Sequence, residues 1–149
     1  MTTLTSPSSS AQQTAGAASL THEHSKATKV VRTMFGAAFV MFGLNGFLHF
    51  MSPPPMSEGG MTFMGAMMAS GYFFPFLKAT EIISGLLILS GRMTALGLVI
   101  LAPIIVNILA FHLALAPASL PMAVMLVGIQ GWLAWKHRAA YRGLFDCGC

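Results

Sequence analysis

A lysine and a glutamate interrupt an otherwise apolar run, FPFLKATEIISGLLILSG, at residues 74–91. Lys78 and Glu81 are three residues apart, so on a helix they share one face, where an ammonium and a carboxylate can pair or exchange a proton. Ionisable side chains inside a membrane are costly and most often functional. Three interpretations are open: a structural ion pair, a proton-linked site, or a Lys78 that only reaches toward the lipid headgroups.

Further polar side chains lie in the other apolar stretches. Asn45 and His49 are four residues apart and share a helix face. Asn107 and His112 are five apart, about 140° round an ideal helix, so both can face one site only if the helix bends. Asn107 is therefore the better candidate of the two. Gln130, in the last stretch, lies nearer the opposite side of the bilayer than the rest.

The composition indicates a membrane protein. Hydrophobic residues make up 55% of the 149-residue chain and charged residues only 8%, whereas soluble domains carry about a quarter charged residues. Proline- and glycine-containing segments separate four apolar stretches, each near the roughly 20 residues that cross a bilayer. These predicted spans are about Val30 to Phe50, Phe74 to Ser90, Met93 to Leu113, and Leu120 to Trp135. We therefore expect an all-α membrane protein, a four-transmembrane-helix bundle, with a short interfacial helix over residues 61–73 between spans one and two.

The two ends of the chain differ from its centre. Residues 1–28 are rich in Ser, Thr, Ala and Gln and contain no apolar block, which predicts a disordered polar tail and no cleaved signal. The membrane domain is expected over residues 29–145. Residues 146–149 form a short tail with Cys147 and Cys149, which is either dispensable or able to exchange thiols or contribute to a soft-metal site. Two ligands do not make a metal site, so none is predicted.

The basic residues set the predicted orientation, because cytoplasmic flanks of membrane helices carry excess Lys and Arg. Seven of the eight flank the first span, follow the last one or lie in the turn after the second: Lys26, Lys29, Arg32, Arg92, Lys136, Arg138 and Arg142. Both termini are therefore expected in the cytoplasm. The lipid bilayer accounts for the net charge of +4, and no nucleic acid partner is needed. In this orientation every intramembrane polar group except Gln130 falls in the outer half of the bilayer.

Several segments together resemble the DoxX family of small four-helix integral membrane proteins. They are NGFLHF, MGAMMASGYFFPFLKATEIISGLLILSGR, GLVILAPIIVNILAFHLALAP and LAWKHRAAYRGLF, and the resemblance covers residues 30–145. Four motifs are its most specific features. The K-x-x-E-x-x-x-G stripe is Lys78, Glu81 and Gly85, and the Gly-Arg turn is Gly91 and Arg92. The P-x-x-x-N of span three is Pro103 and Asn107, and the terminal R-x-x-Y is Arg138 and Tyr141.

The resemblance implies a role in redox assemblies of the bacterial inner membrane. Members of the family are similar to a subunit of an archaeal thiosulfate:quinone oxidoreductase, and some act as membrane partners in redox or thiol-stress assemblies. Many members have no established activity. Whether this chain is an enzyme therefore stays open.

The residues themselves provide no electron carrier. There is no CxxCH, no CxxC near the bundle and no Gly-rich nucleotide loop, so no intrinsic cofactor is predicted. A quinone could still bind, because its carbonyls need donors and its reduction needs protons. Lys78, Glu81, His49 and Asn107 supply such groups, supported by Asn45. Weaker candidates for the same site are His112, Gln130 and Arg92.

We expect a non-catalytic or quinone- or proton-linked subunit, with a redox enzyme or a second copy of the chain as partner. One alternative is a small oligomeric transporter or channel for a solute or proton, and another is a purely structural membrane partner. Copper(I) handling is a further alternative, because methionines cluster between spans one and two at Met51, Met56, Met61, Met64, Met67 and Met68. Met is also an ordinary apolar filler of interfacial helices.

Overall fold

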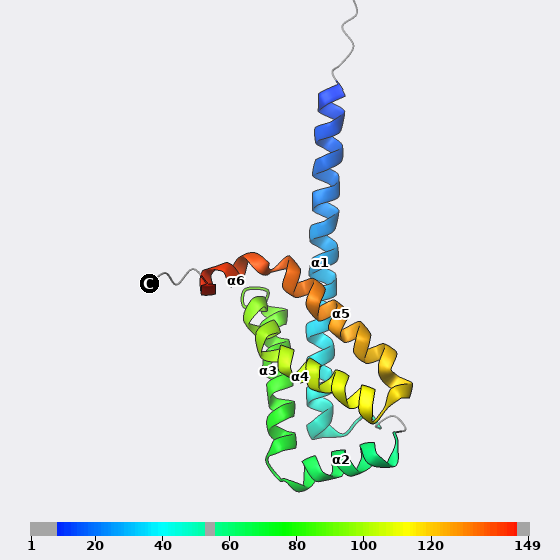
Figure 1. Cartoon of the computed structure of the whole chain (residues 1–149). Coiled ribbons are helices and arrows are strands. Elements are labelled where there is room, and N and C mark those ends of the chain that lie inside the picture. The colour runs from blue at the N-terminus through cyan, green and yellow to red at the C-terminus, as the bar shows by residue number, and fades with distance from the viewer. Residues whose placement is uncertain (1–8, 53–55, 146–149) are drawn as a thin grey trace, which may run out of the picture.

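The computed structural model describes residues 9–52 and 56–145, with side chains over 26–52 and 56–141. All elements in these ranges are helices (Figure 1). In chain order they are α1 (Ser9–Leu48), α2 (Glu58–Ala69), α3 (Phe73–Ser90), α4 (Thr94–Ala114), the 3-10 turn η1 (Pro117–Ser119), α5 (Leu120–Lys136) and α6 (Arg138–Phe145). Four segments are long and apolar enough to span a membrane: Lys26–Leu48, Phe73–Ser90, Thr94–Ala114 and Pro117–Lys136. The predicted four-span, all-α membrane architecture is confirmed.

The short helix expected between the first two spans is α2. It starts at Glu58, before the apolar block at 61–73, because the Ser57 side chain accepts a hydrogen bond from the Gly60 N–H at 3.2 Å and caps the helix. Its 12 residues are too few to cross a bilayer. In Figure 1, α2 lies across the end of the bundle rather than along it.

Helix α1 starts well before the first span. Its backbone is helical from Ser9, whereas the composition predicted disorder over residues 1–28. Extending an existing helix needs no new nucleation, and no proline occurs between Pro7 and the span, so the helix continues backward through this polar segment. In Figure 1 this part of α1 extends alone beyond the other helices. Residues 1–8 and the tail at 146–149 lie outside the described ranges.

The helices pack in the order α1, α3, α4, α5, and α5 also touches α1. Large apolar side chains from all four fill the centre: Phe35, Phe39, Ile88, Leu98, Leu101, Ile104, Ile105 and Leu133. Large apolar side chains also cover the outer faces, as at Met34, Phe76, Val106 and Trp135. Such an outer surface fits contact with lipid rather than water.

Glycines bring α1 and α3 into close contact. A Cβ added at Gly85 of α3 would lie 2.8 Å from the backbone oxygen of Gly36 and 2.8 Å from Cγ2 of Val40. A Cβ at Gly43 would lie 2.6 Å from the side chain of Ile82. Small residues at such contacts let two membrane helices pack backbone against backbone.

The predicted cytoplasmic flanks of the membrane spans lie together at one end of the bundle, here called the basic end. The guanidinium of Arg32 on α1 lies against Gly91 in the α3–α4 turn, whose φ of 73° is the left-handed conformation that glycine adopts readily. The Tyr141 hydroxyl on α6 donates to the Ala95 carbonyl oxygen at 3.3 Å, and burial raises the pKa of this phenol, which favours the protonated donor. The opposite end, with α2 and η1, is called the loop end.

Candidate functional site

Lys78 and Glu81 form a salt bridge on α3. The Lys78 Nζ lies 2.9 Å from Oε2 and 3.1 Å from Oε1 of Glu81, so one ammonium group donates to both carboxylate oxygens. The Lys78 side chain is 18% exposed and that of Glu81 only 5%. Glu81 belongs to the buried stripe of α3, with Ser84, Gly85 and Ile88. The predicted pair is therefore formed, with its carboxylate on the buried face of α3.

Two glycines of α1 make room for the lysine. A Cβ at Gly46 would lie 2.3 Å from Cγ and 2.5 Å from Cδ of Lys78, and one at Gly43 would lie 2.9 Å from the Lys78 carbonyl oxygen. The ring of Phe74 lies beside the ammonium, with its centroid 5.6 Å from Nζ, which is cation–π range. The sequence did not lead us to predict that these two glycines contact Lys78, although they lie one helix turn apart on one face of the first span.

Asn45 and His49 do not join the pair. The Asn45 side chain turns toward the chain that follows α1, where Oδ1 accepts from the Met51 N–H at 2.7 Å and Nδ2 donates to the Met51 carbonyl at 3.3 Å. His49 is exposed, with a positive φ of 51°, and its N–H donates to the Asn45 carbonyl at 2.9 Å. Both residues therefore shape the end of α1, and the structure gives neither a bond to Lys78 or Glu81.

Asn107 and His112 also lie apart from the pair. Asn107 is exposed on the outer face of α4, and its side chain forms no hydrogen bond within the described residues. His112 is half-buried, with Nδ1 2.7 Å from the Ile108 carbonyl oxygen of its own helix and its ring against Phe111. The two side chains point in different directions, as their five-residue spacing predicted.

Gln130 and Arg92 have separate roles. Gln130 is buried, and its Nε2 donates to the Leu98 carbonyl at 2.6 Å, which ties α5 to α4. Arg92 is exposed in the α3–α4 turn at the basic end, whereas Lys78 is near the start of α3 at the loop end. The site in the structure is thus the Lys78–Glu81 pair, with Gly43, Gly46 and Phe74 around it.

We expect Gln130→Leu to destabilise the bundle by about 1 kcal/mol, because it removes a hydrogen bond between two membrane helices. The free energy of unfolding in detergent, measured by titration with a denaturing detergent, gives the size of the effect. Val124→Leu, at an exposed position on the same helix, is the matched control and is expected to change little. Equal stability of Gln130→Leu and wild type would show that the bond contributes nothing.

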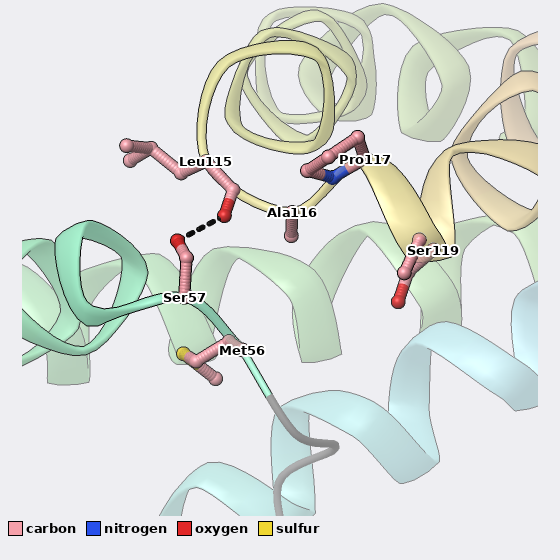
Figure 2. A pocket seen from close by; sticks show the side chains of 7 residues that line it. Met56, Ser57, Leu115, Ala116, Pro117 and Ser119 are labelled. Carbon is pink, nitrogen blue, oxygen red and sulfur yellow. Dashed lines mark hydrogen bonds between the residues drawn. The ribbon is translucent and has the colours of Figure 1, made fainter.

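A pocket of about 280 Å³ lies at the loop end, and neither Lys78 nor Glu81 lines it (Figure 2). The start of α2 and the turn between α4 and α5 line it, and the Ser57 hydroxyl donates to the Leu115 carbonyl across its edge. Its lining residues are Met56, Ser57, Leu115, Ala116, Pro117, Ala118 and Ser119. None of these side chains is ionisable at neutral pH, so the pocket offers no acid–base chemistry.

The described residues include no group of three or more His, Cys, Asp or Glu side chains that could hold a metal ion. Of the methionines of α2, Met67 is buried, whereas Met61 and Met68 are exposed and Met64 is half-buried.

Comparison of the chain with family models, with curated proteins and with solved structures found no match.

Proposed function

We propose that the chain is a membrane subunit of a bacterial redox assembly and that Lys78 and Glu81 form its proton-linked site. The observation that carries the proposal is the salt bridge between the buried Glu81 and the partly buried Lys78 on a helix long and apolar enough to span a membrane. Replacing a buried ion pair by apolar residues of similar size is often neutral or even stabilising, so a role in stability alone is a poor reason to have one. Ionisable residues inside membrane helices characteristically mark proton or substrate pathways.

The two side chains have the groups that a quinone site requires. The ammonium of Lys78 can donate to a carbonyl oxygen, and the carboxyl group of Glu81, which already receives hydrogen bonds from Lys78, can hold or release a proton next to it. Lys78 is the more exposed partner, so a lipid-soluble ligand would meet it first. A bound quinone would supply the electron chemistry, and this chain would position it and handle its protons.

The rest of the assembly must come from a partner, because the sequence has no motif for an electron carrier. The resemblance to the DoxX family supports a redox enzyme as that partner and the bacterial inner membrane as the location. The basic end supports an orientation with both termini in the cytoplasm, because positive residues are enriched on that side of membrane proteins. In this orientation the Lys78–Glu81 pair lies in the outer half of the bilayer.

The alternative of a channel within one chain is less well supported. Large apolar side chains from α1, α3, α4 and α5 meet at the centre of the described bundle, where a water-filled path would have to run. A transport function would therefore need a passage between copies of the chain.

Purification in mild detergent from native membranes tests the proposal. We expect wild type to retain quinone or a redox enzyme, and Glu81→Gln to lose it, because the amide has a similar shape but cannot exchange a proton at this position. Absorbance, lipid extraction and mass analysis identify what copurifies. Ligand-free protein with the same profile for both forms would contradict a redox role.

A further inference from the structure

Asn107 occupies an unusual place on the outer face of α4. It is exposed and lies thirteen residues after Thr94 in a 21-residue helix, so it is about 20 Å along the axis and about 10 Å from the far end. Other outward-facing residues of α4, including Val99, Val106 and Leu113, are apolar and more than half exposed. The amide therefore faces hydrocarbon, well inside the span.

An amide in this position needs a partner. Lipid tails cannot form hydrogen bonds, and moving an amide from water to hydrocarbon without such a bond costs several kcal/mol. Asparagine is too short to reach the headgroups from this depth. Its side chain forms no hydrogen bond within the described part of the chain, so the partner is expected to come from another molecule.

Small residues beside Asn107 would let another helix approach. Ala110 and Ala114 are both exposed, and they lie three and seven positions after Asn107, on the same face of α4. Two small residues four apart form the small-xxx-small pattern that allows close packing of membrane helices. A polar group that lacks a partner and a surface suited to close contact thus occur together.

We propose that this face, defined by Asn107, Ala110 and Ala114, is a dimer interface that binds α4 of a second copy. Copies inserted in the same orientation are related by a twofold axis along the membrane normal, so their Asn107 side chains lie at the same depth. An amide is both donor and acceptor, so Nδ2–H of each Asn107 donates to Oδ1 of the other. A different protein would need its own polar group at this depth, whereas a second copy has one by symmetry. The interface does not depend on the proposed redox function.

Energy transfer between donor- and acceptor-labelled full-length chains in liposomes tests this interface over a range of protein-to-lipid ratios. We expect Asn107→Leu to weaken association about 3- to 20-fold, the range of hydrogen bonds between membrane helices. Asn107→Gln keeps the donor and the acceptor and should retain most of the association. Ala110→Leu should weaken it by blocking close approach. Both positions are exposed, so these variants are expected to fold, and helix content by circular dichroism checks this.

Disulfide cross-linking provides a control for position. In a background with Cys147→Ser and Cys149→Ser, Ala110→Cys should form a cross-linked dimer, whereas Leu86→Cys, on the exposed face of α3, should not. Equal cross-linking at the two positions would indicate random collision and overturn the proposal. So would unchanged association of Asn107→Leu, or a wild type that remains monomeric at every ratio.

Discussion

Lys78→Met is expected to destabilise the protein by about 3–5 kcal/mol, the usual effect of removing one partner from a buried ion pair. The Glu81 side chain is 5% exposed, and Lys78 is the partner of both its oxygens. Without the ammonium group, the carboxylate would remain in a low-dielectric interior with its negative charge uncompensated. The free energy of unfolding in mixed micelles, compared with wild type, measures the effect.

The double variant Lys78→Met/Glu81→Leu separates the cost of a broken pair from the value of an intact one. Because both charges are removed, we expect its stability to lie within about 1 kcal/mol of wild type, or above it. Gly46 leaves space beside position 78 that the methionine side chain can occupy. A double variant as unstable as Lys78→Met would show that the pair is needed for the fold, which would weaken the case for a functional site.

Gly85→Val is expected to destabilise the protein by about 3 kcal/mol, because it overpacks the contact between α1 and α3. Its Cβ would meet the Gly36 backbone oxygen at 2.8 Å and the Val40 backbone nitrogen at 3.0 Å, and backbone atoms cannot rotate away as a side chain can. The two helices would have to separate, which would also disturb the contact of α1 with the Lys78 side chain. Thermal unfolding followed by circular dichroism measures the loss.

Gly128→Ala is the matched control for this prediction. Gly128 lies on α5, and a Cβ added there meets no atom within 4 Å. Since alanine also favours helix more than glycine does, the expected change is zero or a small gain in stability. Equal losses in Gly85→Val and Gly128→Ala would indicate a general sensitivity to glycine substitution and contradict the specific contact.

The sequence was sufficient for the fold because membrane insertion depends on simple quantities. Apolar length and the placement of prolines and glycines located all four spans and the short helix between the first two. The start of α1 could not be located in this way. Residues 9–28 have the composition of a disordered tail, and their helical backbone depends on continuity with the span that follows.

The candidate site was only partly predictable, for a geometric reason. Lys78 and Glu81 lie on one helix, so their spacing alone placed them together. Asn45 and Asn107 lie on other helices, and sequence position gives their depth but not the rotation of each helix about its axis. That rotation is set by contacts between helices, such as Gly97 of α4 against the Ser84 backbone oxygen of α3, and Asn107 lies on the exposed face of α4.

The measurement that tests the central claim most directly is purification of the folded double variant Lys78→Met/Glu81→Leu from native membranes, beside wild type. If the pair is a proton-linked redox site, the double variant should show wild-type unfolding behaviour and yet have lost the quinone or redox enzyme that wild type retains. A double variant that is equally stable and carries the same ligand and partner would contradict this function for the pair.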